Sequence, residues 1–135
     1  RAVRGHGATL NGSAIGVSNA NSVTEGIIGF GFSHRVKPAS TLLSLESLIG
    51  AGGMFQRNGS GALTLAYVAC GRYVGFFEAH INSWDVLAGL ALVYEAGGWS
   101  TPFLSNDGLR KGNSLVTGAP GIESELREIC SSILS

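Results

Sequence analysis

The chain has 135 residues, enough for one hydrophobic core of ordinary size, and its nine basic residues balance its nine acidic ones. This balance gives no electrostatic reason to expect nucleic acid or an anionic membrane as a partner, and the longest apolar run, residues 86–94, is far shorter than the ~20 residues that span a bilayer. Charged residues make up only 13% of the chain, about half the usual ~25%, which indicates that another body covers part of its surface.

The first predicted element is a hairpin. Asn11-Gly12 is a favoured two-residue hairpin turn, and it lies between the apolar segments 8–10 and 14–17. Residues 25–32 are short, apolar and glycine-containing, which is typical of a buried strand. Pro38 stands at the favoured first-turn position of a helix. One apolar face of that helix is predicted from Leu42, Leu45, Leu48 and Ile49.

The elements continue to alternate after this helix. The pattern predicts a strand at 54–57, a helix at 62–71, a strand at 73–81 and a helix at 85–96. Short strands at 99–103 and 114–117 enclose a polar loop, and residues 121–134 close the chain as an amphipathic helix. The apolar stripe of this last helix consists of Ile122, Leu126, Ile129 and Ile133.

This alternation, with inner segments that are apolar on all sides, predicts a layered α/β fold in which helices cover a mostly parallel sheet. No repeat or linker divides residues 1–135, so one structural unit is expected. Cys70 and Cys130 lie in predicted helices without a motif spacing, and we expect both to be reduced, buried and structural, as in a cytoplasmic protein. Because the chain opens at Arg1 without a methionine, we expect it to be part of a longer polypeptide.

Asp85 places a carboxylate at the junction of the third strand and the third helix. As the N-cap it would accept backbone N–H groups, a contribution of about 1 kcal/mol. As a hard oxygen ligand it would bind Mg2+, which usually takes one or two carboxylates together with waters and substrate phosphate. The two roles are compatible, because one oxygen can cap the helix while the other binds the metal.

Two further features could contact a substrate. Glu78 lies within an otherwise apolar strand, where it is either a solvated, outward-facing side chain or an acceptor for the hydroxyls of a polyol. Gly59, Ser60 and Gly61 stand where a strand ends and a helix begins. Ser60 is either a plain N-cap between turn glycines or part of a helix N-terminus that receives an anion or a sugar hydroxyl.

Other residues have weaker patterns. Residues 5–7 form a Gly-x-Gly without the rest of a dinucleotide-binding fingerprint. The three histidines, His6, His34 and His80, have no ligand spacing, and we expect them at the surface or in packing contacts. In the segment Glu95-Ala96-Gly97-Gly98, Gly97 is predicted to end a helix in a left-handed cap, and Gly98 to allow close packing.

The motifs Trp84-Asp85 and Glu95-Ala96-Gly97-Gly98 together resemble the C-terminal signature of the inositol monophosphatase family. The resemblance implies alternating α and β layers, a homodimer, and Mg2+-dependent hydrolysis of phosphate monoesters. It also implies that Asp85 is a catalytic residue and metal ligand that contacts the substrate. Ser33-His34-Arg35 departs from the family's Ser-Ser-Arg at His34, so Arg35 is a weak candidate for a phosphate or interface contact.

The same resemblance implies that Glu78 accepts hydrogen bonds from substrate hydroxyls and that Gly59, Ser60 and Gly61 contact the substrate ring. Ser60 stands in place of the family's Thr and Gly61 in place of its Ala, which keeps the hydroxyl and the small size. The family's other metal ligands, a Glu and an Asp-Pro-x-Asp-Gly-Thr motif, are absent from this sequence.

One carboxylate cannot hold a cluster of Mg2+ ions against water, because Mg2+ dehydrates reluctantly. We therefore expect residues 1–135 to be the C-terminal part of a single inositol monophosphatase-like domain, inactive without the missing N-terminal half as its partner. The complete protein is expected to hydrolyse a small-molecule phosphate ester, first of all inositol monophosphate. The alternatives are a phosphatase of histidinol phosphate, nucleoside bisphosphate or fructose bisphosphate, and a non-catalytic binding module that keeps the substrate half of the fold.

Overall fold

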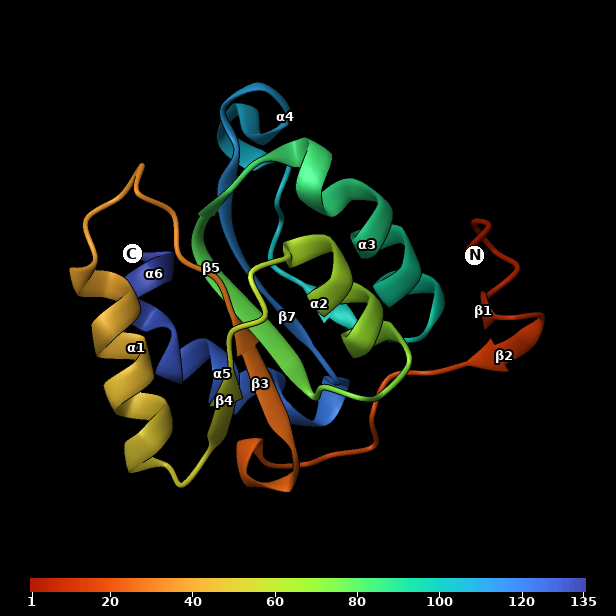
Figure 1. Cartoon of the computed structure of the whole chain (residues 1–135), viewed down its shortest axis with the longest axis horizontal. Helices are drawn as coiled ribbons and strands as arrows, with labels where there is room; N and C mark the ends of the chain where they lie inside the picture. The colour runs from red at the N-terminus through yellow and green to blue at the C-terminus, as the bar shows by residue number, and fades with distance from the viewer.

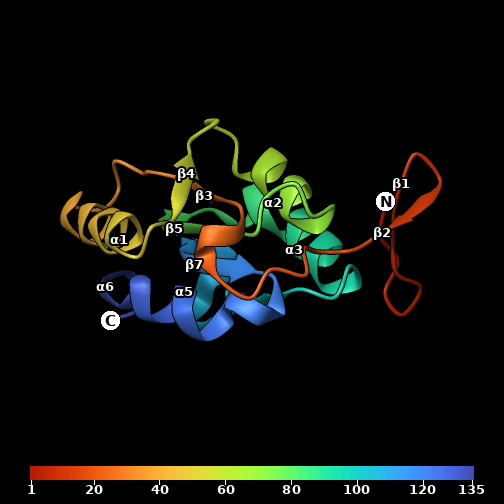
Figure 2. The same ribbon diagram turned by 90° about the horizontal axis from the view of Figure 1, so that it is seen from below.

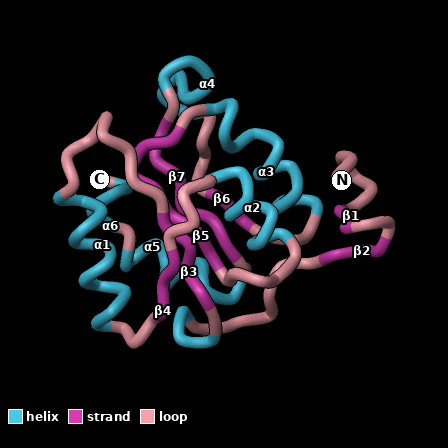
Figure 3. The backbone as a smooth tube through the Cα atoms, in the orientation of Figure 1, coloured by secondary structure: helices cyan, strands magenta, loops and turns pink.

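A five-stranded sheet forms the middle layer of the protein, whose computed structural model describes residues 1–135 (Figure 1). Its strands lie in the order β4 (Met54–Gln56), β3 (Ile27–Phe30), β5 (Gly75–Ile81), β7 (Asn113–Gly118) and β6 (Trp99–Ser100) (Figure 3). β3 pairs in parallel with β4 and β5, whereas β7 is antiparallel to both β5 and β6. The layered α/β fold with a mostly parallel sheet is thus confirmed: β4, β3, β5 and β6 run in the same direction, and β7 alone runs against them, which makes the sheet mixed. β7 is reversed because the segment after β6 does not cross over the sheet as α3 does but returns the chain directly along β6, which suits antiparallel neighbours.

Helices cover both faces of this sheet (Figure 2). One face carries α2 (Gly61–Ala69) and α3 (Ser83–Glu95), and the other carries α1 (Ala39–Gly50), α5 (Glu123–Ile129) and α6 (Ser131–Leu134). Side chains alternate along each strand. In β5, Phe76 packs into the core beneath α2 and α3, while its neighbour Phe77 packs into the core beneath α1, α5 and α6. The two hydrophobic cores are therefore separated by the sheet.

The predicted hairpin consists of β1 (Ala8–Leu10) and β2 (Ser13–Ile15), and it stands beside the carboxyl end of α3, away from the sheet (Figures 1 and 2). Asn11 and Gly12 both have positive φ, 51° and 83°, as the predicted turn requires. A short 3₁₀ helix, η1 (Val23–Glu25), leads from the hairpin into β3.

Helix α1 has the predicted position but a different buried face. Leu48 is buried, whereas Leu42 and Ile49 are 60% and 57% exposed. Small polar side chains take their place, since Ser44 Oγ lies 3.1 Å from the Ser132 hydroxyl of α6. Helix α1 therefore packs closely on the C-terminal helices through Ser44, and part of its apolar surface remains exposed.

The C-terminal segment is divided where one helix was predicted. It consists of η3 (Pro120–Ile122), α5 and α6, with a break at Cys130, and the predicted stripe of Ile122, Leu126, Ile129 and Ile133 is nevertheless buried. The polar loop before β7 contains η2 (Ser105–Asp107) and α4 (Gly108–Lys111). Both cysteines are free thiols, and Cys130 is buried as predicted. Cys70 is only half-buried, because it lies at the end of α2 and not inside the helix. None of the helices combines the length and apolar composition needed to cross a membrane.

Candidate functional site

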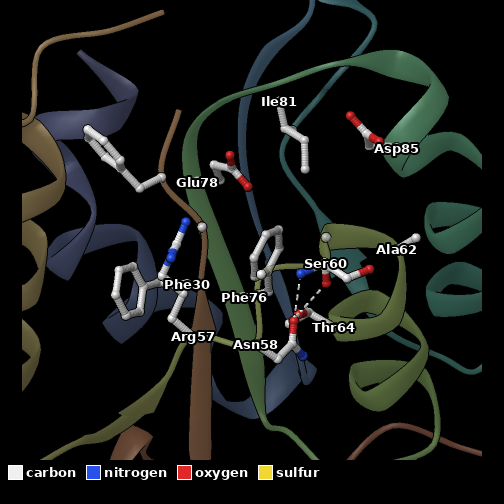
Figure 4. Close-up of a pocket in the computed structure, with 14 residues that line it drawn as sticks. Phe30, Arg57, Asn58, Ser60, Ala62, Thr64, Phe76, Glu78, Ile81 and Asp85 are labelled. Atoms are coloured by element: carbon white, nitrogen blue, oxygen red, sulfur yellow. Dashed lines mark hydrogen bonds between the residues drawn. The ribbon is translucent and has the colours of Figure 1, made fainter. Parts of the chain in front are cut away.

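A cavity of about 250 Å³ opens at the carboxyl ends of the three parallel strands (Figure 4). Helix α1 follows β3 on one face of the sheet and helix α2 follows β4 on the other, so the chain leaves a crevice between them at the strand ends. Such crevices are where open α/β sheets bind ligands. All five predicted site residues line this cavity: Gly59, Ser60, Gly61, Glu78 and Asp85.

Glu78 points into the cavity from β5 and is only 8% exposed, so it is not a solvated outward-facing side chain. Burial, followed by repulsion from Asp85, raises the pKa of Glu78 from 4.5 to about 7, against the opposing influence of Arg57 and Arg35. The carboxylate lies directly against Gly31 at the end of β3, where a side-chain carbon would overlap it. The cavity thus contains a carboxyl group that is held close to its ionisation point near neutral pH.

Asp85 lies in the first turn of α3 and is not its N-cap. The helix begins at Ser83 with Asn82 as the N-cap, because the backbone turns helical directly after β5 ends at Ile81. The carboxylate of Asp85 is exposed at the cavity and takes part in neither of the chain's ion pairs, Lys111–Asp107 and Arg127–Glu123. Its oxygens are therefore free to bind a ligand from outside the chain.

Ser60 is the N-cap of α2, as one of its two interpretations predicted. Its hydroxyl accepts a hydrogen bond from the Leu63 N–H at 3.2 Å. Gly59 has a φ of +82°, which favours glycine, and a side-chain carbon on Gly61 would overlap Ile81. Gly61 and Ala62, whose amides have no intrahelical acceptor, line the same cavity. The small residues shape the loop, and the helix N-terminus offers donors to a ligand.

The structure also places residues at the cavity that the sequence pattern did not single out. Arg57, directly after β4, lines the cavity together with Gly31 and the aromatic side chain of Phe30. An adjoining cavity of about 500 Å³ shares Glu78 and Asp85 and is also lined by His34 and His80 and by Arg35, which the sequence had named as a weak candidate for a phosphate contact. The position of Arg57 at the end of the predicted strand, two residues before Gly59, could have indicated its role, but no local pattern reveals which way its side chain points.

The remaining motifs have structural explanations. Gly5 and Gly7, both with positive φ, donate backbone hydrogen bonds to the two carboxylate oxygens of Glu95, each at 2.9 Å. His80 Nε2 lies 2.9 Å from the Lys111 carbonyl and connects β5 to α4. Gly97 ends α3 with a φ of 87°, as predicted.

A Mg2+ ion would find only part of a ligand set in this chain. The unpaired Asp85 carboxylate fits the preference of Mg2+ for hard oxygen donors. However, no group of three or more His, Cys, Asp or Glu side chains is arranged to hold a metal. The residues present are compatible with Mg2+ at Asp85, provided that other ligands come from outside these residues.

Comparison with known proteins identifies the family. A family model described as the inositol monophosphatase family matches residues 1–132. The inositol-1-monophosphatase of Rhizobium meliloti (strain 1021) is 38% identical over 130 residues, which cover 95% of this chain and 49% of that protein. The Nus factor SuhB of Xylella fastidiosa (strain Temecula1) is 42% identical over 111 residues, which cover 81% of this chain and 40% of that protein.

Solved structures agree with this assignment. The crystal structure of the extragenic suppressor protein suhB from Bartonella henselae superimposes with a TM-score of 0.85 at 34% identity, over 96% of this chain and 50% of that one. The chain therefore spans about half the length of the relatives it matches. The match over nearly all of its residues shows that the chain belongs to the inositol monophosphatase family.

Proposed function

We propose that the complete protein hydrolyses a phosphate monoester of a polyol in a Mg2+-dependent reaction, with inositol monophosphate as the first candidate substrate. The observation that supports this most directly is the unpaired Asp85 carboxylate beside the buried Glu78 in one cavity. The family assignment supports phosphatase chemistry in general.

In this proposal Asp85 holds Mg2+ and is in contact with the substrate. Bound Mg2+ would stabilise the leaving alkoxide of the ester and polarise its phosphoryl group. Glu78 accepts hydrogen bonds from the polyol hydroxyls, and burial keeps it from exchanging them freely for water. Gly59, Ser60 and Gly61 form the wall against which the substrate ring lies, with the first amides of α2 as donors.

The other half of the family's domain is proposed to complete the metal site. The 135 residues cover about half of each relative and offer no complete metal cluster. We therefore propose that these residues alone are inactive. The exposed apolar side chains of α1, such as Leu42 and Ile49, support association of the complete protein as a homodimer. The free cysteines suit a cytoplasmic location.

A second candidate is a non-catalytic binding module. Several relatives are named Nus factor SuhB, a name that does not designate an enzyme. Under this alternative, the isolated chain binds inositol phosphate without any metal. Histidinol phosphate and nucleoside bisphosphate remain alternative substrates under the first proposal.

The test is Asp85→Asn in the complete protein. Since altering a residue that merely supports a metal ligand costs about 10- to 100-fold in activity, we expect the loss of the ligand itself to reduce turnover about 100-fold or more. The dependence of the remaining rate on Mg2+ concentration should also weaken. Glu95→Gln at the opposite end of α3 serves as the matched control and should leave turnover unchanged. Unaltered Mg2+ kinetics in Asp85→Asn would exclude Asp85 as the metal ligand.

A further inference from the structure

The loop between β4 and α2 contains an Asn-Gly pair, Asn58-Gly59, whose residues both line the cavity. We infer that Asn58 is a site of spontaneous deamidation, whose product adds a third carboxylate to the cavity that contains Glu78 and Asp85. The conversion itself does not depend on the proposed function, whereas its effect on substrate use rests on it.

The reaction needs only these two residues and water. The Gly59 nitrogen attacks the side-chain carbonyl carbon of Asn58 and forms a C–N bond, which is favourable because both groups belong to one short segment. The bond from that carbon to Nδ2 breaks, and Nδ2 leaves as ammonia with the proton of the Gly59 amide. Water then opens the cyclic imide at either of its carbonyl groups, so aspartate or isoaspartate remains at position 58.

The attacking nitrogen of Gly59 is unobstructed. Its N–H donates no hydrogen bond within the chain, because Gly59 lies outside every helix and strand and takes part in no turn hydrogen bond. The residue is exposed, and nothing lies within 4 Å of the position that a side-chain carbon would occupy. No hydrogen bond therefore has to break before the nitrogen attacks.

Hydrogen bonds polarise the carbonyl group that is attacked. Asn58 Oδ1 accepts a hydrogen bond from the Ser60 N–H at 2.9 Å (Figure 4). The Thr64 hydroxyl lies 3.0 Å from the same oxygen and is shared with the Ser60 carbonyl at 2.7 Å. These donors stabilise the negative charge that the oxygen gains during the attack, as in an oxyanion hole. Asn58 is exposed, so ammonia can leave into solvent.

The chain carries its own comparison in the hairpin turn. Asn11-Gly12 is the only other Asn-Gly pair, and a serine follows each pair. Asn11 is exposed too, but no donor contacts its side-chain oxygen, and the turn holds its backbone at a φ of 51°. We expect Asn58 to deamidate about fivefold faster than Asn11, the effect of one hydrogen bond on a rate.

The product changes the cavity in two ways. A carboxylate at position 58 increases the negative charge around Glu78 and Asp85, so a phosphate ester binds more weakly. Isoaspartate also adds a backbone carbon before Gly59, which displaces the start of α2. Both forms are therefore expected to lower substrate use.

Peptide mapping by mass spectrometry measures both Asn-Gly pairs in one sample. The complete protein is incubated in mildly alkaline buffer, and the converted fractions at Asn58 and Asn11 are followed with time. The rate ratio should be about five in the folded protein and about one in denaturant, where the hydrogen bonds to Asn58 are absent. A folded ratio of one or less would overturn the inference, as would the same ratio in both states.

The effect on activity is tested with variants of each pair. Asn58→Ser cannot lose ammonia and still offers an oxygen to the Ser60 N–H, so its activity on inositol monophosphate should not decline during incubation. Unmodified protein and Asn11→Ser should lose activity in parallel with conversion at Asn58. Asn58→Asp should raise KM about tenfold, as expected for like charges in a cavity.

These outcomes separate the inference from the proposed function. An equal decline in Asn58→Ser and unmodified protein would overturn the effect on substrate use. If the complete protein does not hydrolyse inositol monophosphate even before incubation, the proposed function is wrong, and the rate ratio still decides whether Asn58 is the deamidation site.

Discussion

The two ends of helix α3 use the same chemical group in opposite ways. At the cavity end, the Asp85 carboxylate has no partner within the chain. At the hairpin end, both oxygens of Glu95 accept backbone hydrogen bonds from Gly5 and Gly7. An acidic side chain in the last turn opposes the helix dipole, and these two bonds offset that cost. A carboxylate that the backbone satisfies stabilises the fold, whereas an unpartnered one at a cavity is available to a ligand.

Glu95 at the hairpin end and Glu78 beside Asp85 change the stability of the fold in opposite directions as the pH rises. Hydrogen bonds from Gly5 and Gly7 lower the pKa of Glu95, so its contribution to stability is present above its ordinary pKa and is lost as the pH falls below it. Burial raises the pKa of Glu78, next to Asp85, to about 7. Ionising Glu78 therefore destabilises the fold as the pH rises from about 4.5 to about 7.

Among variants that keep the carboxylates of Glu78 and Asp85, we expect Gly31→Ala to lower the activity of the complete protein the most. The new methyl group would overlap the Glu78 carboxyl and displace it. Because misplacing a positioning group by about 1 Å costs up to about 100-fold, we expect kcat/KM of the complete protein to fall by about 10- to 100-fold. Gly50→Ala is the matched control, since nothing lies near its added carbon and its φ is not positive. Unchanged kinetics in Gly31→Ala would show that the position of Glu78 does not matter.

Glu78→Gln should remove a pH dependence from stability. The unmodified protein is expected to lose thermal stability between about pH 4.5 and pH 7, because the folded state holds the Glu78 proton more tightly than the unfolded state. In the variant, the midpoint of thermal unfolding should vary less over this interval and lie higher above pH 7. Parallel pH profiles of the two proteins would contradict the raised pKa of Glu78.

Glu95→Gln should have the smallest effect, confined to the hairpin end. The amide keeps one acceptor oxygen but loses the charge, so the hydrogen bonds to Gly5 and Gly7 weaken. Hydrogen exchange at these two amides should become faster, and the unfolding midpoint should fall slightly, with turnover unchanged. Glu128→Gln, an exposed change on α5 without such bonds, controls for loss of charge. Reduced turnover in Glu95→Gln would show that the two ends of α3 are not independent.

The features that were predicted correctly depend on short-range geometry. The hairpin follows from Asn11-Gly12, whose positive φ angles few other residue pairs tolerate. The cap at Ser60 and the helix end at Gly97 involve atoms only a few residues apart. One interpretation of the sequence placed Asp85 as the cap before the helix, whereas it lies in the first turn. A cap residue and a first-turn residue occur in similar sequence patterns, so the pattern did not distinguish them.

These local turns, caps and helix ends can be predicted from the residues alone, because backbone sterics and contacts over three or four residues decide them. The direction of β7, the buried face of α1 and the assembly of the cavity depend instead on how the elements pack together. Glu78 is buried because Gly31, from a neighbouring strand, leaves room for its carboxyl group. Arg57 reaches the same cavity because β4 ends beside β3. Such contacts join residues far apart in the chain, so no local pattern encodes them.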